Sequence, residues 1–377
     1  MLSICRILAK VGYEVRTLCT TAFDTPGQNA RKWHESLGLK IVENKPCECT
    51  LPVWTFEADS ILHNLMDTPG QHTNGWEGRH GGDFEKALDA ILDGFVPDAT
   101  LTYAGMPCFV NCRRKIRKKG GVVVLGLRNH GYFSKNAMTE VDYGLASSNW
   151  LAGRYASFFG RNIEGLPSPL VEKDIIPDKS EQIFYTFVNP ATHKGALFFI
   201  RMAEELSLAR PDIPLLILDS QDLGAKLVSL GIQHGIDLRR HANIMLAPKV
   251  PKPRDYMHVT RAVLVPSLWE EPSGRVAAEA QLCGIPAIVS DRGGLPETVG
   301  EAGIVLHIDN AIRAETRQLP PAEAVREWID MIVRMTDDEA FYRQSCANAM
   351  RAGERYKESV IGPQYVAYFD SLRPARE

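Results

Sequence analysis

The stretch that decides the fold is RAVLVPSLWEEPSGRVAAEAQLCGIPAIVSDRGGLPETVGEAGIVL, residues 261–306. Its apolar opening ends at Pro266 and runs into a polar loop, which predicts a buried strand. Ser273 is expected to be the N-cap of a helix with one apolar face, which the pair Gly284 and Pro286 ends. A second apolar run, AIVS, then predicts another strand. A strand, a helix and a strand in this order are typical of a parallel α/β sheet.

Two loops of this segment are expected at one edge of the sheet, because ligands of open α/β sheets bind beyond the carboxyl ends of the strands. The first loop leads into the helix, whose opening amides at Gly274, Arg275 and Val276 suit a phosphate group. Gly293 and Gly294 lie in the second loop. Since glycine has no side chain, we expect Gly274 and these two glycines to let a ligand approach the backbone.

Two carboxylates flank the start of this helix. Glu271 precedes the helix, and Glu279 follows eight positions later on its second turn. A carboxylate accepts hydrogen bonds and can bridge two neighbouring hydroxyls, so two of them spaced along one ligand suit sugar rings. An isolated pair would more simply be a loop charge and a solvated helix glutamate. The surrounding strand, helix cap and diglycine loop favour a ligand site.

The remainder of the chain repeats the alternation of strand and helix signals on both sides of a proline-bearing linker, residues 164–180. The predicted fold class is therefore α/β, with two doubly wound parallel sheets in 377 residues. We place the first domain at residues 1–168, the second at 169–355, and a final helical segment at 356–377. The sequence opens on a helix, and we therefore expect the first strand of the first domain to lie upstream of the given sequence. We expect a strand and turn of about 15 to 30 residues upstream.

Composition excludes several classes of protein. The formal net charge is −3, so no global positive field would hold nucleic acid. The sequence lacks the roughly 18 consecutive apolar residues of a membrane span and has no export signal, so we expect a cytoplasmic protein. Residues 113–119, RRKIRKK, are a solvated helix face or a site of peripheral contact with an anionic membrane at its inner face. Cysteines 47, 49, 108 and 112 lack the CxxC spacing of zinc knuckles, so no metal site is expected.

The segment 261–306 resembles the nucleotide-sugar-binding signature of retaining GT-B glycosyltransferases, specifically glycosyltransferase family 4. The shared parts are two glutamates separated by seven residues, a G-x-P strand, and a GG-x-PE loop. The likeness extends more weakly through FVNPATHKGALFFI, residues 187–200, and DYGLASSNWLAGRY, residues 142–155. The resemblance implies two Rossmann-like domains facing a cleft, with the final helix packing back on the first domain.

The family's roles carry over to matching positions of this chain. The resemblance implies that Glu271 contacts the transferred sugar, Glu279 the ribose and Lys194 the donor diphosphate, with catalytic parts for Glu271, Lys194 and His130. It also implies a donor-binding part for the helix start and the glycine loop, at Ser273, Gly274, Arg275, Gly293, Gly294 and Leu295. Glu297 is a weaker candidate. Many relatives have an arginine shortly before the lysine, where this chain has Asn189 to Thr192, and Arg275 or Arg292 could replace it.

The activity implied is metal-independent, cofactor-free transfer of a hexose from a nucleotide-diphospho-sugar to a hydroxyl acceptor, with retention of configuration. The acceptor could be a glycan, a lipid-linked molecule or a small molecule, as in polysaccharide biosynthesis. Two alternatives stay open at this point. One is a noncatalytic nucleotide-sugar-binding protein, and the other is a different GT-B enzyme such as a sugar-nucleotide epimerase or a phosphorylase.

Overall fold

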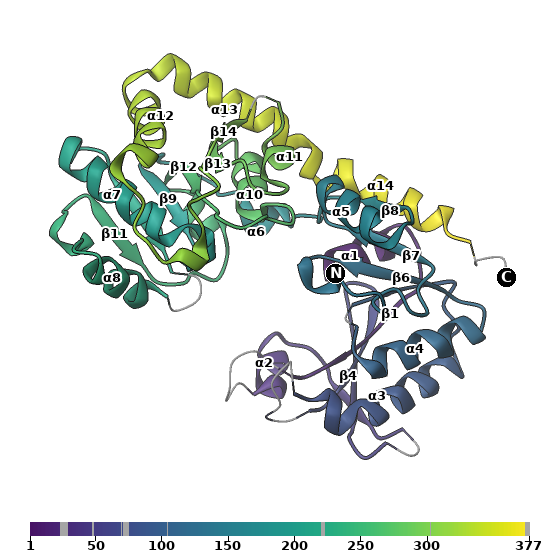
Figure 1. Ribbon diagram of the computed structural model, residues 1–377. Coiled ribbons are helices and arrows are strands. Elements are labelled where there is room, and N and C mark those ends of the chain that lie inside the picture. The colour runs from purple at the N-terminus through teal and green to yellow at the C-terminus, as the bar shows by residue number, and fades with distance from the viewer. Residues whose placement is uncertain are drawn as a thin grey trace. The chain divides into compact units, whose positions relative to one another are not determined.

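The computed structural model describes residues 1–22, 29–46, 49–68, 70, 75–103, 105–219, 223–301 and 303–373 (Figure 1). The chain forms two compact units. The first comprises Met1–Ala146, Ala152–Leu166 and Gly362–Glu377, and the second comprises Ser147–Leu151 and Pro167–Ile361. The division therefore lies at 166/167, beside the boundary expected at 168, and the end of the chain belongs to the first unit.

The second unit is built on a six-stranded parallel sheet with the order β11-β10-β9-β12-β13-β14. Its strands are β9 (Phe184–Val188), β10 (Leu215–Leu218), β11 (Ile244–Ala247), β12 (Thr260–Val265), β13 (Ala287–Ser290) and β14 (Ile304–Leu306). Strands β10 and β11 follow β9 on one side of the sheet, and β13 and β14 follow β12 on the other side. The strand order thus reverses between β9 and β12, and this is the point where open α/β sheets bind ligands. The predicted parallel sheet is confirmed here.

Helices cover both faces of this sheet because its strands are apolar on both sides. Successive residues of β12 show this: Ala262 and Leu264 pack in one core with Phe199 and Trp328, whereas Val263 packs in a second core with Leu295. The helices of the second unit are α6 (Glu172–Ile175), α7 (Ala196–Ala209), α8 (Gly224–Gln233), α9 (Arg254–Met257), α10 (Arg275–Leu282), α11 (Leu295–Val299), α12 (Arg326–Asp337) and α13 (Glu339–Gly353). Two helices have residues in both units, α5 (Asn149–Phe159) and α14 (Glu358–Ser371).

The first unit holds two four-stranded sheets. One is parallel throughout, with the order β5 (Ala99–Thr102), β6 (Val122–Leu127), β7 (Tyr143–Ala146) and β8 (Ile163–Gly165). The other has the order β1 (Val15–Thr20), β4 (Ile61–Met66), β3 (Val53–Ala58) and β2 (Val42–Asn44). Only β1 and β4 are parallel in this second sheet. Helices α1 (Leu2–Lys10), α2 (Ala30–Ser36), α3 (Glu77–Leu92) and α4 (Pro107–Lys118) complete the unit.

The expectation of a wholly parallel first domain is therefore wrong for β2 and β3. Strands β3 and β4 form an antiparallel hairpin whose two-residue turn is Asp59 and Ser60, both with positive φ. Hairpin turns of this kind are usually marked by Asn-Gly or Asp-Gly. Asp-Ser gives no such signal, and this is why the sequence did not reveal the hairpin. In the part of the chain that the structure describes, no helix is both long and apolar enough to cross a membrane.

Candidate active site

The candidate site of the second unit lies at the carboxyl ends of β9 and β12. After β9 the chain forms a 3₁₀ turn, Thr192–Lys194, and Gly195 then opens α7 in the left-handed conformation, with φ +92°. A Cβ atom at Gly195 would collide with the carbonyl of Pro266, which follows β12. Glycine therefore allows the two loops to lie in contact, and Lys194 is held beside the loop that carries Glu271.

Lys194 and Glu271 form an ion pair, in which Lys194 Nζ lies 2.6 Å from Glu271 Oε1. The hydroxyl of Ser267 donates to the same oxygen at 2.9 Å. Glu271 is only 5% exposed and Ser267 is fully buried, whereas the Lys194 side chain keeps 24% of its surface exposed. The indole ring of Trp269 flanks the ammonium, with Nζ 5.4 Å from its centre. The pair is a fixed buried carboxylate beside a cation that solvent can reach.

The charges of Lys194 and Glu271 act on the pKa of the neighbouring histidine, His193. His193 packs edge-on against Trp269, with ring centres 5.3 Å apart. Burial and then the positive charge of Lys194 lower the pKa of His193, while Glu271 acts in the opposite direction. His193 is therefore neutral near pH 7, and it adds no charge to the site.

Glu279 is held on the second turn of α10, where it is 4% exposed. Burial raises the pKa of its carboxyl group, and Arg275 opposes this shift from one turn earlier. Arg275 Nε donates to Glu279 Oε1 at 2.7 Å, although the Arg275 side chain is 70% exposed. A carboxyl group of this kind, buried and held by an exposed surface arginine, is suited to accept hydrogen bonds from ligand hydroxyls.

The amino end of α10 differs from the prediction in one detail. Gly274, with φ +69°, is the N-cap in place of Ser273, whose carbonyl instead accepts a hydrogen bond from the hydroxyl of Thr298. Among the described residues, the amides of Gly274, Arg275 and Val276 donate to no acceptor. Three unpaired N–H groups and the helix dipole at this point favour an anion.

The diglycine loop packs against the loop that carries Glu271, and its contact with a donor stays a prediction. Gly293 forms a bridge with Glu271, and Gly294 N donates to Glu271 O at 2.7 Å. A Cβ atom at Gly293 would strike the backbone of Glu271, and one at Gly274 would strike the side chain of Leu295. At Gly293 and Gly274, the side on which a Cβ atom would lie is therefore occupied by another part of the protein, and glycine allows these segments to lie in contact. Leu295 itself is buried in the core.

Two further candidates are occupied elsewhere. The guanidinium of Arg292 donates to the carbonyl of Ile308 at 2.6 Å. The Glu297 carboxylate accepts from the amides of Asn149 at 2.9 Å and Trp150 at 2.7 Å, which is a cap on the first turn of α5. Arg275 is thus better placed than Arg292 to substitute for the absent family arginine.

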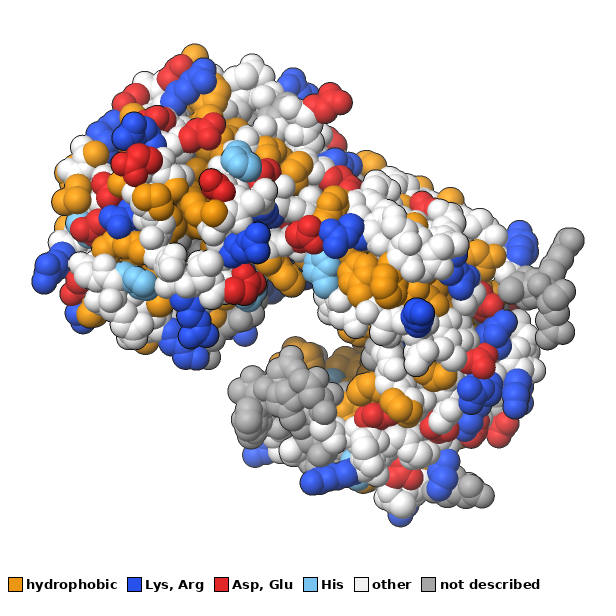
Figure 2. All heavy atoms as spheres, in the orientation of Figure 1, with side chains coloured by type: hydrophobic (Ala, Val, Ile, Leu, Met, Phe, Trp, Pro, Cys, Tyr) orange, Lys and Arg blue, Asp and Glu red, His pale blue; other side chains and the backbone are white. Residues whose placement is uncertain are grey.

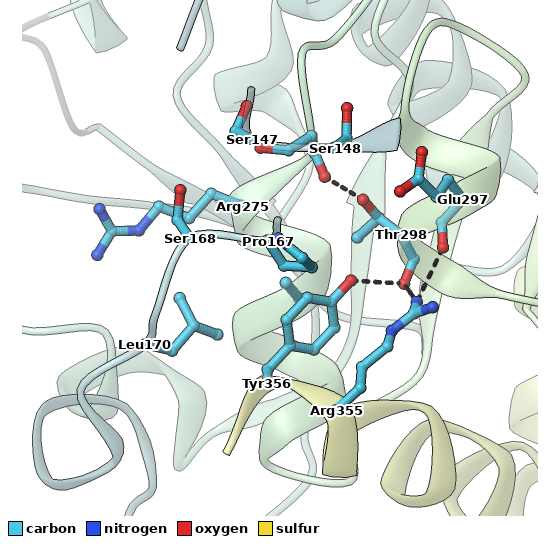
Figure 3. Close-up of a pocket in the computed structure, with 12 residues that line it drawn as sticks. Ser147, Ser148, Pro167, Ser168, Leu170, Arg275, Glu297, Thr298, Arg355 and Tyr356 are labelled. Atoms are coloured by element: carbon cyan, nitrogen blue, oxygen red, sulfur yellow. Dashed lines mark hydrogen bonds between the residues drawn. The ribbon is translucent and has the colours of Figure 1, made fainter. Parts of the chain in front are cut away.

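A small hollow of about 30 Å³ lies beside this group of residues (Figure 3). It shares Ser273 and Arg275 with the predicted site, but Lys194, Glu271 and Glu279 do not line it. Its other lining residues are all in the second unit: Ser147, Ser148, Pro167, Ser168, Leu170, Ala278, Glu297, Thr298, Arg355 and Tyr356. Arg355 and Tyr356 donate to the carbonyl of Thr298, and no motif in the sequence indicated them.

His130 belongs to the first unit, where it begins a short 3₁₀ turn, His130–Tyr132, after β6. The Asn129 side chain accepts from the Gly131 amide at 2.8 Å and caps this turn. The His130 ring stacks on Phe133, with centres 5.9 Å apart. The structure therefore gives His130 a defined position at a strand end, and its action on a ligand of the second unit stays a prediction.

The basic run 113–119 is not an open cationic patch. Arg113 is fully buried and donates to the hydroxyl of Thr102. Arg114 and Arg117 both pair with Glu140, at 3.0 Å each. On the face drawn in Figure 2, basic and acidic side chains are interspersed in the same way. These pairs weaken the field that an anionic membrane would meet.

In the described ranges, no three His, Cys, Asp or Glu side chains are arranged so that they could hold a metal ion. Cys108 and Cys112 lie in an apolar core with Phe84, and burial raises the pKa of the Cys112 thiol to about 12. Cys47 is outside the residues that the structure describes.

Residues 171–319 match the family model described as "Glycosyl transferases group 1". The matched stretch contains Lys194, Glu271, Glu279 and the diglycine loop. Residues 171–319 are a group 1 glycosyltransferase domain. The expected recognition as a glycosyltransferase is thereby confirmed for this domain.

Curated relatives match parts of the same protein. The D-inositol 3-phosphate glycosyltransferase of Paenarthrobacter aurescens is 34% identical over 190 residues, which are 45% of this chain and 42% of that protein. Spore coat protein SA of Bacillus subtilis is 28% identical over 121 residues, which are 30% of this chain and 32% of that protein. The matches of this chain thus span less than half the length of these relatives.

Solved structures resemble the group 1 domain together with the rest of the chain. Sucrose-phosphate synthase from Thermosynechococcus elongatus has a TM-score of 0.66 at 15% identity, covering 98% of this chain and 92% of that one. A glycosyltransferase from Rickettsia africae has a TM-score of 0.68 at 11% identity, covering 98% and 93%. Anabaena HepE in complex with UDP and glucose has a TM-score of 0.65 at 14% identity, covering 96% and 100%. These likenesses confirm the α/β GT-B fold.

Proposed function

We propose that this protein is a retaining glycosyltransferase of family 4, which moves a hexose from a nucleotide-diphospho-sugar to a hydroxyl acceptor without a metal ion or cofactor. The observation that carries the proposal is the joint placement of three features in a group 1 domain. They are the Lys194–Glu271 pair, the buried carboxyl group of Glu279 and the unpaired amides at the start of α10. A cation, free N–H groups and two carboxylates match a diphosphate flanked by two sugars.

The donor would lie along the start of α10. Its diphosphate would contact the Lys194 ammonium and the free amides, while Glu279 would accept from the ribose hydroxyls. Arg275, which holds Glu279 and is mostly exposed, could turn its remaining donors to a phosphate oxygen. Oε1 of Glu271 already has two donors, so its other oxygen would receive a hydroxyl of the hexose.

The reaction we propose breaks the bond between the anomeric carbon and the diphosphate oxygen. The acceptor oxygen forms its bond on the face that the diphosphate leaves, and its proton passes to a phosphate oxygen. Negative charge grows on the diphosphate as the bond breaks, and Lys194 with the α10 amides would stabilise it. Glu271 is fixed by Lys194 and Ser267, so it serves to hold the sugar rather than to attack it.

A thermal-shift panel of UDP, GDP, ADP and their hexose conjugates tests the donor class. UDP comes first because the similar HepE structure holds UDP and glucose. A ligand at 100 times its Kd stabilises the folded protein by about 2.7 kcal/mol, which a melting curve resolves. The responding donor is then incubated with glycan, lipid-linked and small hydroxyl acceptors. Sugar transfer with retained configuration supports the proposal, whereas binding without turnover on any acceptor supports a noncatalytic sugar-nucleotide protein.

Contact with an anionic membrane through residues 113–119 remains a prediction at a cytoplasmic surface. The pairing of Arg114 and Arg117 with Glu140 counts against it. Flotation with vesicles containing phosphatidylserine tests the contact, and we expect weak, salt-sensitive binding.

A further inference from the structure

Glu271 receives both of its side-chain hydrogen bonds on one oxygen. Lys194 Nζ lies 2.6 Å and Ser267 Oγ 2.9 Å from Oε1. Among the described residues, nothing donates to Oε2. The two oxygens of this carboxylate are therefore unequal: one is bound to the protein, and the other is available to a ligand.

Ser267 is more deeply buried in the site than Lys194. It follows β12 and is fully buried, and its carbonyl accepts from the hydroxyl of Ser290 at 2.7 Å. A serine hydroxyl has one proton to donate. Two backbone carbonyls, those of His193 and Trp269, lie near Ser267 Oγ at 3.4 and 3.3 Å, both farther than Glu271 Oε1. The proton therefore goes to Glu271.

The last torsion of a glutamate side chain is soft, because rotation about a bond between sp³ and sp² carbons has broad minima. Hydrogen bonds must fix which oxygen faces the ligand. Lys194 can do this in the unliganded protein, but a diphosphate would draw its ammonium away from Glu271. Ser267, which is buried and has no other task in the site, would remain.

We propose that Ser267 is a positioning residue that holds Oε1 of Glu271 and so presents Oε2 to the transferred hexose while Lys194 serves the diphosphate. The inference rests on the proposed function and adds to it the group that fixes the sugar-binding carboxylate. It predicts that Ser267 matters for ligands that contain the hexose and not for the nucleotide diphosphate alone.

Calorimetric titration tests this with UDP-, GDP- and ADP-glucose, each beside its matching diphosphate. In Ser267→Ala we expect about tenfold weaker binding of the sugar nucleotide, the effect of losing one hydrogen bond to a charged group, and less than twofold weaker binding of the diphosphate. Ser345→Ala is the matched control, because it removes a buried hydroxyl that donates to Phe341 O on α13. It should change neither affinity.

A double-mutant cycle separates positioning from general structural damage. If Ser267 acts through the Glu271 carboxylate, Ser267→Ala should have little further effect in a Glu271→Gln background. Additive losses, or equal weakening of sugar nucleotide and diphosphate, would overturn the inference and leave the proposed function intact. Failure of the wild-type protein to bind any of these probes would overturn the proposed function and this inference with it.

Discussion

Gly293→Ala should disturb the site through the backbone of Glu271. Gly293 has φ +64°, and its backbone forms a bridge with Glu271. A Cβ atom here would lie 2.7 Å from the carbonyl carbon of Glu270 and closer still to two backbone atoms of Glu271. Ordinary contact begins near 3.4 Å, so the two loops would have to separate by about 1 Å to relieve the closest of these contacts.

Two costs add in this variant. The left-handed conformation costs a residue with a side chain about 1–2 kcal/mol, and forcing extra atoms into packed structure costs about 1–3 kcal/mol. We therefore expect a loss of about 2–4 kcal/mol in the free energy of unfolding of the second unit, since part of the clash relaxes. At about 3 °C per kcal/mol for a unit of this size, the melting temperature should fall by about 6–12 °C.

Gly235→Ala isolates the conformational cost. Gly235 has φ +81°, and a Cβ atom there would meet nothing within 4 Å. It lies in the same unit, just past the end of α8. This variant should melt about 3–6 °C lower and bind the sugar nucleotide as the wild type does.

Differential scanning calorimetry and transfer kinetics measure the two effects. Displacing a substrate-positioning group by about 1 Å can cost about 100-fold in rate, so Gly293→Ala should lose kcat/KM by that order at temperatures where it is folded. If Gly293→Ala had the same melting temperature as Gly235→Ala and the kcat/KM of the wild type, the loop contact would not position Glu271, and the reasoning would be refuted.

Three other outcomes follow from the charged groups. Lys194→Met should raise the pKa of His193, because the charge of Lys194 lowers it, and Glu271→Gln should lower that pKa, because the charge of Glu271 raises it. An NMR titration that showed no change in either variant would mean that the Lys194–Glu271 pair does not act on His193. The pKa of Glu279 is raised by burial above its ordinary 4.5, so the folded state binds more protons there than the unfolded state. Urea unfolding at a series of pH values should therefore show the wild type losing stability relative to Glu279→Gln as pH rises from about 4.5, and parallel curves would contradict this. Glu297→Ala should lower stability by about 2–3 kcal/mol, because its carboxylate caps α5, yet leave the affinity for nucleotide diphosphate unchanged; a specific loss of affinity would return Glu297 to the donor site.

The order of elements in the second unit could be predicted from local sequence because each element there carries its own signal. The run AVLV ends at a proline, and the following helix is ended by Gly284 and Pro286, so β12, α10 and β13 lie where the sequence indicates them. The juxtaposition of Lys194 with Glu271 also follows from topology, since β9 and β12 are neighbours in a parallel sheet.

Contacts between distant segments could not be predicted in this way. Serine is a favoured N-cap residue, but the carbonyl of Ser273 accepts a hydrogen bond from Thr298, and the N-cap of α10 is Gly274. The purpose of Gly293 depends on a loop more than 20 residues away in sequence, and so no local rule reveals it. Ser267 gave no signal, because a buried serine has no distinctive neighbours in sequence.

Each of the two sheets of the first unit has edge strands, which pair with a neighbour along one side only. Within the described residues, β1 and β5 pair along one side only, and no residue of either strand is fully buried, whereas every residue of β6 is. Backbone amides that face the unpaired sides have no ladder partner to protect them, so they should exchange with deuterium ahead of those of β6. The unpaired backbone N–H and C=O groups of an edge strand can also form hydrogen bonds with an extended segment of another chain. Association through added strands would therefore begin at an edge strand such as β1 or β5, far in sequence from the proposed donor-binding residues.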